Sequence, residues 1–179
     1  MRYYLIGSED GYNGLRFRNV ADWQKYFGFN SSIAESWTAP DLEYIHRTTH
    51  RKFDISTAVS PLYAMSHYAV ECIGEMLLRY GVLLPITFPS GYTFFYCTNI
   101  IDALIAEDSV FNYLDDNKKW IISIDKFTLS EKAIKGQDIF RIPQANYRYT
   151  FFRELFRKLV EKYSLKGIHF NRIETIELK

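Results

Sequence analysis

Two histidines, His46 and His50, lie four residues apart, the spacing that places two imidazoles on one face of a helix. Two imidazoles are half of a zinc site, which needs at least one further protein ligand. The intervening Arg-Thr-Thr is a poor helix former, and no cysteine or third histidine lies near in the sequence. A solvated basic turn is therefore the favoured interpretation, and we expect neither a metal ion nor another cofactor.

The remaining catalytic residue types do not form a recognised pattern. Ser66 and His67 are adjacent, so on a helix their side chains point in different directions. No strand-elbow-helix motif presents a nucleophilic serine. The carboxylates Asp102, Glu107 and Asp108 have no recognisable partner for acid-base catalysis. The sequence thus favours a protein that is not an enzyme.

The most specific local pattern is Asn99, Asp102 and Ser109, which follows an aromatic strand over residues 92–96. One interpretation makes these three polar side chains a functional motif, either a binding site or the polar pocket of an uncharacterised small enzyme. The other is structural: Asn99 satisfies turn backbone groups, Asp102 caps a helix, and Ser109 makes a local hydrogen bond. The sequence leaves both interpretations open.

The amino-acid composition limits the classes of protein to which this chain can belong. The chain has 179 residues, of which 47% are hydrophobic and 24% charged, as in an ordinary globular domain. A net charge of +1 argues against a nucleic-acid-binding protein, which usually carries a clear basic excess. Two cysteines are too few for a disulfide framework, and no apolar run is long enough for a signal peptide or a membrane span. We therefore expect a cytoplasmic protein without a membrane or nucleic-acid partner.

The hydrophobic pattern predicts helices over residues 61–80, 101–114 and 152–163 and strands over residues 92–97 and 120–129. Ser60 and Pro61 have the residue types of a helix N-cap and first position. The helices 61–80 and 152–163 have matched apolar faces, formed by Met65, Ile73 and Met76 and by Phe152, Leu155, Phe156 and Leu159. The expected fold is a single α+β domain, with a mostly antiparallel sheet packed by these two principal amphipathic helices.

Several further segments occur in a fixed order along the chain. They are Asp54-Ile55, Pro61-Leu62, Leu83-Leu84-Pro85, Tyr92 to Tyr96, Asn99, Asp102-Ala103-Leu104, Ser109, Phe127, Ile139-Phe140-Arg141 and Lys166 to Phe170. In this ordered set the chain resembles a family of bacterial immunity proteins that are found beside polymorphic or contact-dependent toxins. The resemblance covers residues 53–179, whereas residues 1–52 match only as a first strand and a variable N-terminal part.

The resemblance implies a protein that binds a cognate toxin domain in the cytoplasm and neutralises it by occlusion. It implies a protein partner and no catalytic activity. The alternatives are the small enzyme described above, with its pocket near Asn99, Asp102 and Ser109, and a non-catalytic adaptor protein. The sequence does not indicate the oligomeric state or the chemistry of the toxin.

Two segments of the N-terminal part are suited to partner binding. Residues 10–32 are rich in aromatic side chains, and accessible aromatics on a structured loop are good interface anchors. A basic turn follows, whose charges can steer association with an acidic toxin surface. The predicted partner-binding residues are Tyr12, Phe17, Trp23, Tyr26, Arg47 and Arg51. The competing interpretation is that the aromatics simply cover the sheet.

Overall fold

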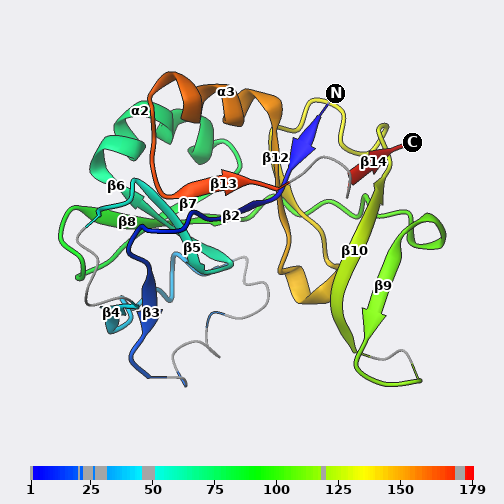
Figure 1. Ribbon diagram of the computed structural model, residues 1–179, viewed down its shortest axis with the longest axis horizontal. Coiled ribbons are helices and arrows are strands. Elements are labelled where there is room, and N and C mark those ends of the chain that lie inside the picture. The colour runs from blue at the N-terminus through cyan, green and yellow to red at the C-terminus, as the bar shows by residue number, and fades with distance from the viewer. Residues whose placement is uncertain are drawn as a thin grey trace.

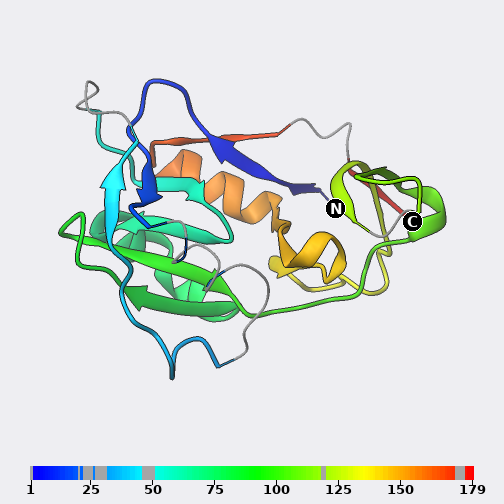
Figure 2. The same ribbon diagram turned by 90° about the horizontal axis from the view of Figure 1, so that it is seen from below.

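The computed structural model describes residues 2–19, 21, 26, 32–45, 51–117, 120–171 and 176–179. It has the predicted α+β architecture with mostly antiparallel strands. Helices α2 (His67–Leu78) and α3 (Glu154–Lys162) lie on one side of the strands at one end of the molecule. A long hairpin, β9 (Val110–Tyr113) and β10 (Ile121–Leu129), forms the opposite end (Figures 1 and 2).

The largest sheet lies beneath α2 and has the order β5-β6-β8-β7, with every neighbouring pair antiparallel. Its strands are β5 (Ile55–Val59), β6 (Leu62–Ser66), β7 (Gly81–Pro85) and β8 (Tyr92–Cys97). Helix α2 packs against β6, β7 and β8. The strand predicted over residues 92–97 is confirmed as β8, the inner strand that pairs with both β6 and β7.

Smaller antiparallel units complete the fold. They are the sheet of β1 (Tyr3–Tyr4), β12 (Thr150–Arg153) and β11 (Ile139–Arg141), and the pairs β2 (Ile6–Ser8) with β13 (Ile168–Phe170) and β3 (Leu15–Phe17) with β4 (Leu42–Tyr44). The one parallel pair among the described strands joins β14 (Ile176–Leu178) to β10. The turns η1 (Ala106–Asp108) and η2 (Gln144–Tyr147) are short 3-10 segments.

The core has three clusters, of which two meet at the central β12. Phe152 and Phe156 belong to the first cluster, beneath α2 and α3, with ring centroids 4.5 Å apart. Phe151 belongs to the second cluster, at the base of the hairpin, and its ring centroid lies 5.2 Å from that of Phe127 in β10. Because successive residues of a strand face opposite sides, β12 joins the helical end to the hairpin end.

The prediction of one helix over residues 61–80 is wrong in its first part. Residues 62–66 form the central strand β6, and α2 begins only at His67. The N-cap is Ser66, whose hydroxyl accepts from the Ala69 backbone N–H at 3.1 Å and donates to Asp54 Oδ1 at 3.0 Å. Ser60 and Pro61 therefore lie before β6 rather than at a helix start. Met65, Ile73 and Met76 are buried as predicted, on two elements instead of one.

The C-terminal helix is also shorter than predicted. Phe152 lies in β12, and the buried face of α3 consists of Phe156 and Val160, with Leu159 partly buried. Leu155, predicted to be buried, is 46% exposed. On α3 Leu155 lies about 100° around the helix axis from the buried Phe156 and about 140° from Val160, so it falls outside the centre of the buried face.

The two cysteines are expected to differ in reactivity. Cys97 is fully buried in β8, and burial raises the pKa of its thiol to about 12, whereas Cys72 on α2 is partly exposed. Because the thiolate is the reactive form, one thiol per chain should react with Ellman's reagent at pH 8 in the native protein and two after denaturation. Cys72→Ser should abolish the native signal. Rapid native reaction of two thiols would contradict this assignment.

Candidate functional site

Asn99 connects the end of β8 to β11. Its side-chain amide donates to the Ile139 carbonyl at 2.8 Å and to Gln137 Oε1 at 3.0 Å. Its own carbonyl accepts from the Arg141 backbone N–H at 2.9 Å. Asn99 thus makes the backbone contacts that the structural interpretation of the motif predicts.

The helix predicted over residues 101–114 does not form. Ile101 donates its backbone N–H to the Arg141 carbonyl at 2.9 Å, and Ile105 donates to Thr128 at 2.8 Å. These hydrogen bonds go to neighbouring strands rather than to the preceding helical turn, so the segment runs extended, bends through η1 and continues as β9. Tertiary pairing here overrides a local helical pattern.

Because this helix does not form, Ser109 and Asp102 contact different parts of the fold. The Ser109 hydroxyl donates to the Ile105 carbonyl at 2.7 Å and accepts from the Thr128 backbone N–H at 3.0 Å, which fixes the start of β9 against β10. Asp102 is exposed, and its Oδ1 accepts from Gln144 Nε2 at 2.8 Å. Of the three motif residues, Ser109 alone lines the cleft described below.

The predicted partner-binding aromatics pack against the third core cluster. Tyr12 lies beneath the Arg51 guanidinium, which is 4.2 Å from the ring centroid and donates to the Tyr12 hydroxyl at 2.9 Å. Phe17 stacks on Tyr26 at 5.9 Å, and the Tyr26 hydroxyl donates to the Thr38 carbonyl at 2.6 Å. All three rings are partly buried. Their role in binding stays a prediction; Trp23, Arg47, His46 and His50 lie outside the described residues.

The hairpin carries a set of exposed apolar side chains that the sequence reading missed. They are Val110 (49% exposed), Leu114 (71%), Trp120 (68%) and Ile122 (48%). The helix predicted over residues 101–114 includes the residues of β9, so the sequence did not predict this hairpin. Residues 120–122, at the start of the predicted strand 120–129, are all apolar. Successive residues of a strand face opposite sides, so some of these side chains must be exposed unless both faces are covered.

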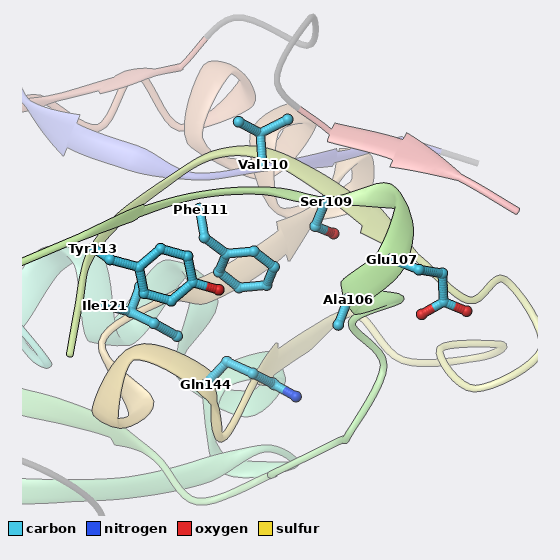
Figure 3. A pocket seen from close by; sticks show the side chains of 8 residues that line it. All are labelled: Ala106, Glu107, Ser109, Val110, Phe111, Tyr113, Ile121 and Gln144. Atoms are coloured by element: carbon cyan, nitrogen blue, oxygen red, sulfur yellow. The ribbon is translucent and has the colours of Figure 1, made fainter. Parts of the chain in front are cut away.

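An open cleft of about 720 Å³ adjoins the hairpin. Phe111, Tyr113 and Ile121 form its apolar wall: the Phe111 and Tyr113 rings stack at 5.9 Å, and Ile121 lies opposite Tyr113 in the strand register. Figure 3 shows this wall with Gln144 facing it from η2 and Glu107 at one end. Ala106, Ser109 and Val110 complete the lining.

The end of the cleft near η1 is acidic. Glu107 and Asp102 are exposed, and neither takes part in a salt bridge within the described part of the chain. Asp108 pairs with Lys179 at 3.0 Å, and this hydrogen bond raises the pKa of the lysine. The Oε1 atom of Gln144 is buried and has no hydrogen-bond partner among the described residues. The cleft therefore offers apolar contact area and the carboxylate of Glu107, and Asp102 is held beside the lining residue Gln144.

The described residues contain neither a metal-binding cluster nor a membrane-spanning helix. No group of three or more histidine, cysteine, aspartate or glutamate side chains there is placed to hold a metal ion. Nor does any described helix have the length and apolarity needed to cross a membrane.

Comparison with known proteins finds no matching family model and no matching curated protein.

Proposed function

We propose that this protein is a non-catalytic immunity protein, which binds a cognate bacterial toxin domain in the cytoplasm and neutralises it by occlusion. Two features support the proposal. One is the ordered resemblance of residues 53–179, and the other is the projecting hairpin with its exposed apolar side chains. Large apolar side chains clustered on a surface are typical of protein interfaces.

The hairpin has the properties of an interface anchor. Tryptophan and tyrosine dominate the energetics of many interfaces, and here Trp120 and Tyr113 lie at and near its tip. Its base is rigidly held, because Phe127 packs edge-on against both Tyr149 and Phe151 at 4.9 and 5.2 Å. A rigid support lowers the conformational entropy lost on binding. Tyr12, Phe17, Tyr26 and Arg51 remain a second proposed contact surface.

The function is tested by co-expression with the C-terminal domain encoded by the gene immediately upstream. If that domain arrests growth, this protein should restore growth and co-purify with it in a one-to-one complex. A toxic domain that this protein neither rescues nor binds would contradict the proposal. Rescue without a stable complex would contradict occlusion.

Within the complex, Trp120→Ala and Leu114→Ala are each expected to weaken affinity by about 10- to 100-fold, because truncating a central anchor costs more than 1 kcal/mol. The melting temperature of the free protein should stay nearly unchanged, since both side chains are about 70% exposed. Isothermal titration calorimetry measures the affinity. Leu78→Ala on α2 is the matched control, an apolar side chain that is 58% exposed at the other end of the molecule.

Tyr12→Ala separates the two proposed surfaces. A loss of affinity in Tyr12→Ala with none in Trp120→Ala would move the interface to the N-terminal segment. A large loss of thermal stability in Tyr12→Ala would instead assign Tyr12 to the core.

A further inference from the structure

Strand β9 is an open edge. Within the described residues it pairs with β10 alone, and the sheet order β14-β10-β9 leaves its other side without a neighbouring strand. The backbone N–H and C=O groups along such an edge can pair with a strand from another chain.

The edge is short and its register with β10 is irregular, but it lacks two other usual protections. Natural sheets guard exposed edges with charged residues or proline. The edge strand β7 of the largest sheet ends in Pro85, and the edge strand β14 contains Glu177. Strand β9 reads Val-Phe-Asn-Tyr, with no charge and no proline, and its Val110 is 49% exposed.

The chemistry beside this edge indicates which kind of strand would fit. The cleft wall of Phe111, Tyr113 and Ile121 suits an apolar side chain. Glu107 lines the end near η1 and Asp102 lies beside Gln144, so this end suits a lysine or arginine. Lys179, paired with Asp108, is the cation that already interacts with Glu107. The hairpin turn is balanced in sequence, Asp115 and Asp116 against Lys118 and Lys119, so the acidic character rests on Glu107 and Asp102.

Gln144 adds an independent observation on the facing side of the cleft. Its Nε2 donates to Asp102, whereas its buried Oε1 has no donor among the described residues. A buried acceptor without a partner is unfavourable by roughly 1–3 kcal/mol. Because the Oε1 atom is buried, a bound segment can supply this donor only if the Gln144 amide, which lines the cleft, turns towards the segment.

We propose that β9 receives an extended basic segment of the partner as an added strand, with an apolar side chain in the cleft and a lysine or arginine near Glu107. This rests on the proposed function, because it specifies how the toxin is bound. Main-chain hydrogen bonds along residues 110–112 supply affinity, and the cleft supplies specificity.

A short fluorescein-labelled peptide tests this without the toxin. Its lysine and phenylalanine residues stand two positions apart, so that both can face the cleft, and a matched peptide replaces each lysine by glutamate. By fluorescence anisotropy the basic peptide should bind about tenfold or more tightly than the acidic one, and the difference should shrink at high salt. Equal affinity, or no binding of either peptide, overturns the proposal.

Backbone methylation tests the added strand itself. Two versions of the basic peptide have alternate backbone nitrogens methylated, so each lacks the N–H groups of one edge. One version should bind like the parent and the other about tenfold more weakly, because only one edge of the peptide faces β9. Two versions that bind like the parent overturn strand addition.

Variants of the protein test whether the peptide binds at the edge strand β9. Val110→Lys places a charge on the edge strand and should weaken peptide binding about tenfold, whereas Ile122→Lys, equally exposed on β10, should change it about twofold or less. Glu107→Lys should weaken binding, and Glu71→Lys, an equal charge change at an exposed position of α2 at the other end of the molecule, should not. Equal effects within either pair overturn the assignment.

The experiments distinguish a failure of strand addition at β9 from a failure of the immunity function. If the neighbouring toxin domain co-purifies but the peptides do not bind, the function stands and strand addition is overturned. If the peptides bind at β9 but the toxic domain is neither bound nor neutralised, strand addition stands and the immunity function is overturned.

Discussion

Arg141→Ala is expected to lower the free energy of unfolding by about 3–5 kcal/mol, because it removes a large side chain from a fully buried site. The Arg141 guanidinium donates through Nε to the Tyr147 carbonyl at 2.8 Å and through Nη1 to the Cys97 carbonyl at 3.3 Å, and lies 4.8 Å from the Tyr96 ring centroid. Alanine would leave both carbonyls without this donor and open a cavity between β8 and η2. Urea denaturation followed by circular dichroism measures the loss.

Arg141→Lys and Arg141→Met separate the contributions to this loss. Lysine keeps the charge but lacks the planar fork that reaches both carbonyls, and methionine keeps much of the volume without a donor. Both should be less destabilising than alanine. A loss below about 1 kcal/mol in Arg141→Ala would show that Arg141 contributes little to stability.

Gly167→Ala is expected to be comparably severe, with a loss of about 4 kcal/mol or more or a failure to fold. Gly167 has φ +102°, and a Cβ there would lie 2.5 Å from the Ile55 carbonyl oxygen and 2.5 Å from Phe53 Cβ. The neighbouring chain cannot retreat, because the Lys166 carbonyl accepts the backbone N–H groups of Asp54 and Ile55 at 2.8 and 3.0 Å. The soluble yield and the urea midpoint report the effect.

Gly136→Ala is the matched control. Its φ is +79°, but nothing lies within 4 Å of the added Cβ, so only the backbone strain of about 1–2 kcal/mol applies. Equal losses at Gly136 and Gly167 would show that the backbone conformation, and not the close approach to Ile55, sets the requirement for glycine.

The fold class and the inner strand β8 were predictable because they depend on local alternation and turn residues. Strand β6 was not, because all five of its residues are buried. A strand covered on both faces gives a continuous apolar run, which hydrophobic spacing cannot distinguish from the start of a buried helix. Its junction with α2 depends on Ser66, whose capping role is evident only once Asp54 is placed beside it.

The candidate site was less predictable than the fold. The spacing of Asn99, Asp102 and Ser109 drew attention to the right segment, but their partners lie in β10, β11 and η2, which sequence spacing does not place. The cleft depends on β9, and β9 exists because Thr128 and Arg141 bind a segment with helical character of its own. Exposure of Trp120 likewise follows from the projection of the hairpin, which is a tertiary property.

The pairing of β1 with a distant strand constrains when the β1-β12-β11 sheet can form during synthesis. Tyr3 pairs with Arg153, and its hydroxyl donates to the carbonyls of Ile134 and Gln137. At about 5–20 residues per second, roughly 8–30 s separate the translation of Tyr3 from that of its partner strand. A growing polypeptide therefore exposes β1 to chaperones until residues 139–153 have been made, and only then can the β1-β12-β11 sheet close.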